Sequence, residues 1–259
     1  MNLYLETESF KISSISNSLF NDRLCELENI RQTALEFNDA FYKNDGIYDV
    51  DFIDQKKIWE WLYLPPTDNK FSDEKKYLMK LLDHAHSIDR GEYSLIVDEI
   101  KCCKCSKPQA LICFINNDYK EIHITEYCEL LKAHRYYLKF ISSPEEFLES
   151  INSCYPNLYF HPDLIFTIKT LSAPINKYIT ELDRHLSALN DNFNEIHQEY
   201  INEGLKKVLE VFSASNQIAC SLEGDPKSAR KRLTYTFQDS DGKNINLTCE
   251  PHTKLEGTG

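Results

Sequence analysis

The stretch that decides the fold class is residues 91–125, GEYSLIVDEIKCCKCSKPQALICFINNDYKEIHIT. Residues 93–97 and 110–115 are β-type runs, and residues 120–125 alternate between polar and apolar side chains. Between the last two runs, residues 116–118 read Asn-Asn-Asp, which is a turn signal. The stretch therefore predicts a small antiparallel sheet with a hairpin at 116–118.

The sequence before this stretch has a helical pattern. Apolar residues recur at three- and four-residue steps over residues 20–41, which predicts one long amphipathic helix that ends at the turn signal of residues 44–46. Two shorter helices are expected, one around Trp59 and one that Ser72 caps. We therefore expect residues 1–90 to form a helical block.

The last part of the chain predicts further helices and then a second hairpin. Ser143, Pro144 and Glu146 combine an N-cap, a first-turn proline and a capping-box glutamate, so a helix is expected to begin there. Apolar stripes within residues 162–213 predict a helical pair. Two alternating runs flank a turn at residues 239–242 and predict antiparallel strands.

Helices and strands thus occur in separate blocks and do not alternate one by one. This order favours an α+β fold over a doubly wound sheet. The predicted organisation is a helical block over residues 1–90, a small α+β segment over 91–160, and a helical pair followed by antiparallel strands over 161–259.

The composition is that of a globular chain with an acidic balance. Of its 259 residues, 42% are hydrophobic and 27% are charged, and the formal net charge is −12. A field of this sign repels phosphate, which disfavours a generic DNA coat and a protein that binds anionic membranes. No run of about eighteen apolar residues occurs, so no membrane span and no membrane partner are expected.

The cysteines indicate the cellular compartment. There are nine of them, an odd number, at uneven spacing. The first residues lack the basic segment and apolar block of a secretion signal. These features predict reduced thiols in the cytoplasm and no disulfide framework.

Cys102 and Cys105 form a C-x-x-C pair, which is half of a candidate zinc site. Two thiolates at this spacing can be aimed at one tetrahedral zinc ion. A second such pair is missing, and the available ligands are Cys113, His123 and Cys128. The alternative, which we prefer, is that these cysteines are small apolar side chains beside the sheet and that the protein has no cofactor.

Lys227, Arg230, Lys231 and Arg232 form a basic run before the C-terminal hairpin. The run reverses the sign of the charge locally, and it is therefore a candidate for contact with phosphate or with an acidic partner surface. The alternative is a solvated loop that keeps an edge strand from aggregating.

Glu250, His252 and Lys254 follow the last predicted strand. In an extended chain, side chains two residues apart share a face, so the three would lie together. A carboxylate, an imidazole and an ammonium are the parts of general acid–base catalysis with charge stabilisation, which makes these residues the candidate catalytic group. The alternative is an ordinary polar strand face, which Pro251 places at an edge or an exit of the sheet.

Two segments carry a resemblance to a known group of proteins. They are His185–Asp191, HLSALND, and Cys249–Leu255, CEPHTKL. Together they resemble uncharacterised bacterial proteins of mobile-element and defence-type gene neighbourhoods, which end in a similar small β segment preceded by helices. The resemblance covers the last 100 or so residues and implies a setting in bacterial antiviral defence or toxin biology.

Three functions follow as hypotheses. The preferred one is a non-enzymatic binding or regulatory component of a bacterial defence-like or toxin-like system, with a protein partner docked on the cationic end of the chain. The second is an enzyme or toxin that acts on nucleic acid, with the basic run on phosphate and the Glu250, His252 and Lys254 group as its acid–base machinery. The third is a zinc-stabilised interaction module built around Cys102 and Cys105.

Overall fold

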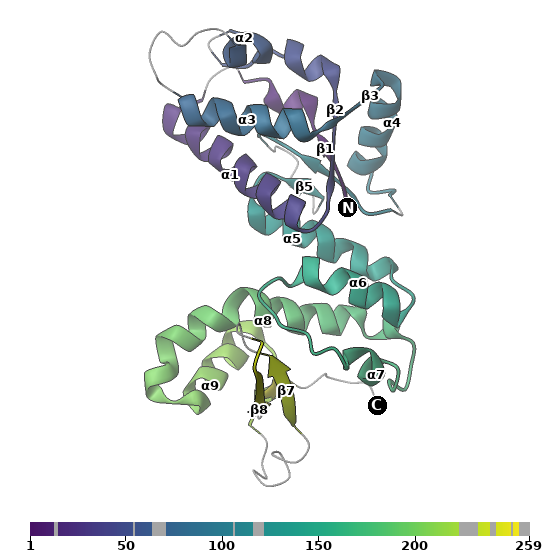
Figure 1. Cartoon of the computed structure of the whole chain (residues 1–259), viewed down its shortest axis with the longest axis vertical. Coiled ribbons are helices and arrows are strands. Elements are labelled where there is room, and N and C mark those ends of the chain that lie inside the picture. Colours follow the sequence, from purple (N-terminus) through teal and green to yellow (C-terminus); the bar gives the residue numbers. More distant parts are fainter. Residues whose placement is uncertain are drawn as a thin grey trace. The chain divides into compact units, whose positions relative to one another are not determined.

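The computed structural model describes residues 1–12, 15–53, 55–63, 71–105, 107–115, 122–222, 233–238, 242–249 and 251–253 (Figure 1). The chain divides into two compact units, Met1–Phe140 and Ile141–Gly259. Each unit has its own helices and its own sheet or hairpin.

The amino-terminal unit is built on one parallel sheet. Its strands lie side by side in the order β3-β2-β1-β4-β5, and every neighbouring pair is parallel. The strands are β1 (Asn2–Leu5), β2 (Ala40–Asn44), β3 (His86–Ile88), β4 (Gln109–Ile112) and β5 (His123–Ile124). Because parallel neighbours need a crossover between them, helices separate most of these strands along the chain.

The helices of this unit lie on both faces of the sheet. In Figure 1, α1 and α3 lie on one face and α4 lies on the other, and α5 packs against α1 and β5. The described helices are α1 (Asn17–Glu36), α2 (Ile58–Tyr63), α3 (Ser72–His84), α4 (Arg90–Lys101) and α5 (Tyr127–Tyr136). The described part of this unit also has three 3-10 turns, η1 (Thr7–Phe10) after β1, η2 (Asp45–Asp49) after β2 and η3 (Tyr137–Phe140) after α5.

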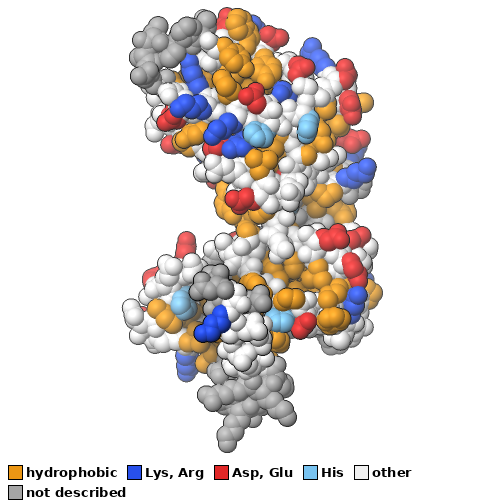
Figure 2. Space-filling view, viewed as in Figure 1, with side chains coloured by type: hydrophobic (Ala, Val, Ile, Leu, Met, Phe, Trp, Pro, Cys, Tyr) orange, Lys and Arg blue, Asp and Glu red, His pale blue; other side chains and the backbone are white. Residues whose placement is uncertain are grey.

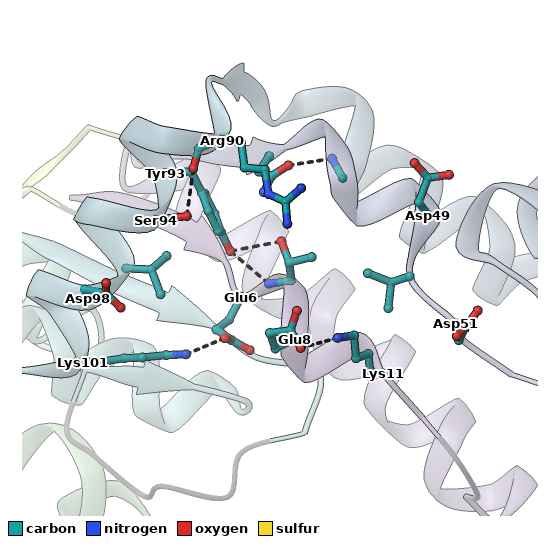
Figure 3. A pocket seen from close by; sticks show the side chains of 15 residues that line it. Glu6, Glu8, Lys11, Asp49, Asp51, Arg90, Tyr93, Ser94, Asp98 and Lys101 are labelled. Carbon is teal, nitrogen blue, oxygen red and sulfur yellow. Dashed lines mark hydrogen bonds and ion pairs between the residues drawn. The ribbon is translucent and has the colours of Figure 1, made fainter.

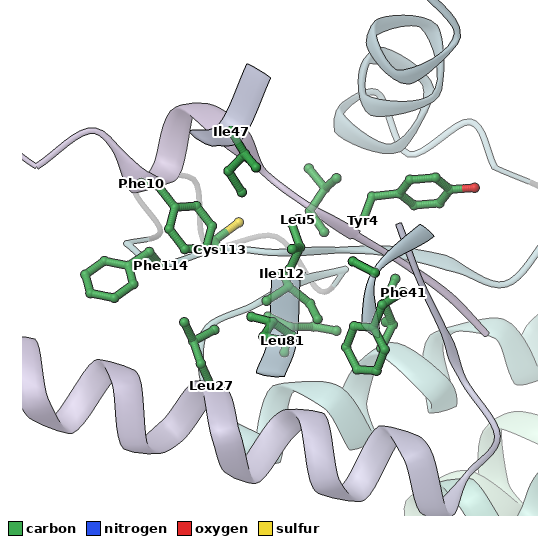
Figure 4. Packing of buried hydrophobic residues seen from close by; sticks show 14 of the residues in the cluster. Tyr4, Leu5, Phe10, Leu27, Phe41, Ile47, Leu81, Ile112, Cys113 and Phe114 are labelled. Atoms are coloured by element: carbon green, nitrogen blue, oxygen red, sulfur yellow. The ribbon is translucent and has the colours of Figure 1, made fainter. Parts of the chain in front are cut away.

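The central strands are nearly continuous apolar runs because both faces of the sheet are covered by the hydrophobic core. Leu3–Leu5 of β1 and Ala110–Ile112 of β4 are buried at every position, as expected for parallel strands covered on both faces. The stripe of α1 packs onto this sheet, and Leu27 points at Ile112 and Phe114 in Figure 4. The described strands and helices of the unit therefore share one hydrophobic core.

The predicted fold class, α+β with a small antiparallel sheet, is wrong for this chain. The central sheet is parallel throughout, and β1, β2 and β3 all lie within the stretch expected to be a helical block. The helix expected over residues 20–41 ends at Glu36, and Phe41 lies in β2. The pairing of β4 with β5 is parallel, which excludes the hairpin expected at 116–118; residues 116–118 themselves lie outside the described residues.

The β-type run at residues 93–97 is also a helix. Asp89 caps α4, and its Oδ1 accepts a hydrogen bond from Gly91 N at 2.7 Å. Within the helix, Tyr93, Val97 and Ile100 are buried. Their spacing of four and three residues matches the helical period, so burial of this face determines the structure although the local composition is that of a strand.

The carboxyl-terminal unit is helical with two small antiparallel sheets. The helix predicted at Ser143 is confirmed, with both hydrogen bonds of the capping box formed, and the hairpin of β7 and β8 is antiparallel as predicted. The described helices are α6 (Pro144–Cys154), α7 (Leu164–Ile168), α8 (Ile179–Tyr200) and α9 (Leu205–Asn216), with the 3-10 turns η4 (Ile175–Lys177) and η5 (Ile201–Glu203). The strands are β6 (Cys220–Ser221), β7 (Thr234–Gln238), β8 (Asn244–Thr248) and β9 (His252–Thr253), and β6 pairs with β9.

A membrane-spanning helix was not expected. Among the described residues, no helix combines the length and the apolar character needed to cross a bilayer.

Candidate functional site

The carboxyl ends of β1, β2 and β3 meet at one edge of the amino-terminal sheet, because the strands are parallel. Each of these strands leads within two residues into a helical turn, namely η1, η2 and α4. The strand order places the topological switch between β1 and β4, and open parallel sheets often bind ligands outside the carboxyl ends of their strands at such a point. The crevice of this unit lies at the same edge but on the β2 side of β1, since no residue of β4 lines it.

A crevice of about 430 Å³ lies at this edge (Figure 3). The loop after β1, the segment after β2 and the length of α4 form its walls. The lining residues are Glu6, Thr7, Glu8, Lys11, Asn44, Gly46, Asp49, Val50, Asp51, Arg90, Tyr93, Ser94, Val97, Asp98 and Lys101. This volume is in the lower part of the range for small-molecule sites, about 300–1,000 Å³.

Tyr93 fixes the wall of α4 to the end of β1. Its hydroxyl donates a hydrogen bond to the carbonyl oxygen of Leu5 at 2.5 Å. The same hydroxyl accepts from the backbone N of Thr7 at 3.0 Å and from Thr7 Oγ1 at 3.2 Å. Burial raises the pKa of Tyr93, so the phenol keeps its proton and its donor role at neutral pH.

Glu6 and Lys101 form an ion pair across the crevice, between the end of β1 and the last turn of α4. Lys101 Nζ lies 2.7 Å from Glu6 Oε1, and the glutamate side chain is only 9% exposed. Burial acts to lower the pKa of Lys101, but the hydrogen bond to Glu6 and the charge of Glu6 outweigh it and raise the pKa. Lys101 is therefore an ammonium ion at neutral pH.

In each of the three helical turns, one backbone N–H group near the start donates a hydrogen bond to a side-chain oxygen of the protein. Glu6 Oε2 accepts from Ser9 N at 2.5 Å, and Asn44 Oδ1 accepts from Gly46 N at 2.6 Å. Asp89 caps α4 in the same way. Helix starts attract anions because their N–H groups lack acceptors, and at this edge side-chain oxygens already meet part of that demand.

Several exposed charged side chains of the crevice have no ion-pair partner among the described residues. Lys11 pairs with Glu8, but the described part of the chain offers no ion pair to Arg90, Asp49 or Asp98. Figure 3 shows the guanidinium of Arg90 reaching into the crevice, with Asp49 across from it in this view. On the face drawn in Figure 2, acidic and basic side chains are interspersed over this unit and do not form one field.

The candidate catalytic group is not seen together. Of its members only His252 is described, because Glu250 and Lys254 lie outside the described residues. His252 is in β9 of the carboxyl-terminal unit, where its Nε2 lies 3.3 Å from Ser221 Oγ. The basic run Lys227, Arg230, Lys231 and Arg232 lies wholly outside the described residues.

The candidate zinc ligands lie at the end of α4. Cys102 is the C-cap residue and is exposed, whereas Cys105 is buried. Cys103 between them has a φ of +53°, in the left-handed region. Burial and the nearby charge of Glu99 raise the pKa of Cys105, which disfavours its thiolate. Within the described ranges, no three His, Cys, Asp or Glu side chains gather in a way that could hold a metal ion.

Sequence reasoning did not find the crevice, because it depends on strands that the sequence pattern did not reveal. β1 has only four residues, too few for a periodic signal. Two local signals were present: the apolar run Leu3–Leu5, which Glu6 follows, and Asp89, a residue type preferred at helix N-caps.

Comparison with protein family models, with curated proteins and with solved structures gives no match for this chain.

Proposed function

We propose that the amino-terminal unit is a binding module for a small polar molecule, held in the crevice at the carboxyl edge of its sheet. The observation that carries this proposal is the convergence of three strand ends on a cavity whose lining includes charges that no described residue pairs. The side chains in question, Arg90, Asp49 and Asp98, are exposed, so a ligand gains binding energy here from charge-assisted hydrogen bonds that replace their contacts with water.

Binding fits these side chains better than acid–base catalysis. A general acid or base works best when its pKa lies near the operating pH. The pKa values of Lys101 and Tyr93 are both raised, which moves both groups further from neutrality. Each also makes contacts that hold the wall of the crevice in place. Their role in this proposal is to position the walls.

The test is ligand binding by the purified full chain. Both tryptophans, Trp59 and Trp61, lie in the amino-terminal unit, so tryptophan fluorescence reports the unfolding of that unit alone. A ligand at about 100 times its Kd should stabilise the unit by about 2.7 kcal/mol against urea. The screen uses amino acids, nucleotides, sugars and polyamines singly.

A matched pair of variants locates the bound molecule. Asp98 lines the crevice, and its neighbour Glu99 is exposed but does not line it. Asp98→Asn should change the affinity for any molecule found, downwards for a cationic group and upwards for an anionic one, and Glu99→Gln should leave it unchanged. Equal affinity in both variants would place the ligand elsewhere and contradict the proposal.

The partner-binding role predicted for the carboxyl-terminal end stays a hypothesis. We propose it as the output of the module, in the cytoplasm of a bacterium and in a defence-type system, on the basis of the basic run and the sequence resemblance. Co-purification with products of neighbouring genes tests it, and a chain that stays monomeric with each of them would count against it.

Two alternatives have their own tests. Nucleic-acid binding through the basic run should weaken with salt, by about one log–log unit per phosphate contact. A zinc module should contain about one equivalent of zinc per chain, because its metal contributes directly to folding.

A further inference from the structure

The charges of the crevice do not balance. Five of its lining residues are acidic and three are basic, which leaves a formal charge of −2. Two of the three cations are already engaged, since Lys101 pairs with Glu6 and Lys11 with Glu8. The remaining negative charge lies on Asp49, Asp51 and Asp98, and of these only Asp51 has a described ion-pair partner, Lys57 at 4.0 Å. The crevice therefore favours a ligand that carries a positive charge.

The crevice also presents donors that lack acceptors. Asn44 is 9% exposed and lines the cavity. Its Oδ1 accepts from Gly46 N, but no described residue accepts a hydrogen bond from its Nδ2. This Nδ2 atom is reached by solvent, so it can donate to an acceptor on a ligand without giving up an internal partner. Arg90 adds a fork of further donors, for which a carboxylate is the matching planar acceptor.

A phosphate group suits this site less well than a carboxylate. Phosphate sites at the ends of parallel strands use several free N–H groups at a helix start. At this edge the side chains of Glu6, Asn44 and Asp89 accept from amides of all three turns. The negative charge of the lining further opposes a dianion.

From these observations we infer that the ligand is a zwitterion of amino-acid size, with an ammonium group for the aspartates and a carboxylate for Arg90 and Asn44. The inference rests on the proposed function and names the chemical class of its ligand. The cavity of about 430 Å³ accommodates a free amino acid. Asp49 and Asp51, in the segment after β2, provide the ammonium subsite. Arg90 at the start of α4 provides part of the carboxylate subsite.

Calorimetry on the full chain tests this inference with each standard L-amino acid, its N-acetyl form and its methyl ester. We expect one or a few amino acids to bind, and both blocked forms to bind at least about tenfold more weakly, because each lacks one of the two charges. Inorganic phosphate, nucleotides, spermidine and neutral sugars are measured under the same conditions.

Variants assign the two ends of the ligand. Arg90→Ala should reduce affinity for the amino acid at least about tenfold while changing affinity for its methyl ester little. Asp49→Asn should reduce affinity for the free amino acid at least about tenfold while changing affinity for its N-acetyl form little, because that form lacks the ammonium group. Lys132→Ala and Glu99→Gln are exposed controls outside the crevice and should bind as the unmodified chain does. The urea midpoint from tryptophan fluorescence verifies that each variant is folded.

The outcomes separate the inference from the proposed function. If the N-acetyl form or the ester binds as well as the free amino acid, the zwitterion is wrong although the crevice binds ligand. If a nucleotide, a sugar or spermidine binds instead and Arg90→Ala or Asp49→Asn weakens it, the binding function stands and the ligand class is wrong. If no member of the panel binds, both the inference and the proposed function are overturned.

Discussion

Removal of one hydroxyl group, in Tyr93→Phe, should destabilise the amino-terminal unit and loosen the wall of the crevice. The hydroxyl makes one donated and two accepted hydrogen bonds, to Leu5 O and to the backbone N and Oγ1 of Thr7. Thr7 is only partly buried, so its Oγ1 can turn to water in the crevice, whereas Leu5 is fully buried. The variant therefore leaves one buried carbonyl and one partly buried amide without their partner.

The magnitude follows from these lost partners. An unsatisfied buried polar group costs about 1–3 kcal/mol, and the amide at the crevice costs less because water can reach it. The expected total is about 2–3 kcal/mol. With a urea dependence of about 1–2 kcal/mol per molar for a unit of this size, the unfolding midpoint should fall by roughly 1–3 M.

Urea unfolding followed by tryptophan fluorescence measures this loss in the correct unit, because Trp59 and Trp61 both lie in it. Tyr63→Phe is the matched control, since Tyr63 is 58% exposed and its hydroxyl has no described hydrogen bond. We expect the control to unfold as the unmodified chain does. If Tyr93→Phe unfolds at the same urea concentration as Tyr63→Phe, the hydroxyl does not anchor α4 and the reasoning about the crevice wall is refuted.

Two further predictions concern buried charged groups, and a third concerns the cysteines at the end of α4. Glu28→Gln should cost about 2–4 kcal/mol at pH 7, because it breaks the buried pair with Arg31 at 2.7 Å. Burial acts to raise the pKa of Glu28, but the hydrogen bonds and charge of Arg31 outweigh it and lower the pKa. This stabilisation is therefore present above the ordinary pKa near 4.3 and is lost as the pH falls through the lower folded value. The urea midpoints of Glu28→Gln and of the unmodified chain should converge towards low pH, and a difference that stays constant with pH would contradict this reasoning. Lys43→Met should cost about 1–3 kcal/mol in the same assay, because Lys43 Nζ donates to two carbonyls at the end of α3, at 2.6 and 3.0 Å, and an unchanged midpoint would show that these bonds contribute nothing net. Maleimide labelling of the native chain, mapped by mass spectrometry, should modify exposed Cys102 and spare Cys105, whose burial raises its pKa; equal labelling would mean that the end of α4 opens readily.

Local signals in the sequence determined those elements whose ends and faces are encoded by neighbouring residues. The helix at Ser143 was predictable because its cap, its first-turn proline and its glutamate make their contacts within four residues. The C-terminal hairpin was predictable because its turn and alternation lie within sixteen residues of each other. The buried face of α1, from Phe20 to Ala34, was visible in its spacing for the same reason.

The direction of the strands could not be obtained in this way. Alternation and apolar content are the same in parallel and antiparallel strands, and the direction is set by the path of the chain between them. The run at residues 93–97 has β-type composition, yet the surface of the sheet buries Tyr93 and Val97 on one helical face. Tertiary burial outweighs a local preference that is worth at most about 1 kcal/mol per residue.

What the sequence by itself determined is thus the set of contacts made within one or two turns of the chain: most helices of the carboxyl-terminal unit, its hairpin, and the acidic charge balance. Only the tertiary structure decided the parallel sheet and the crevice at its edge. Glu6, Asn44 and Arg90 are 38 to 84 residues apart along the chain and come together because three parallel strands end side by side. No local sequence pattern predicts that these residues lie together, because their contacts in the crevice are with residues far away along the chain.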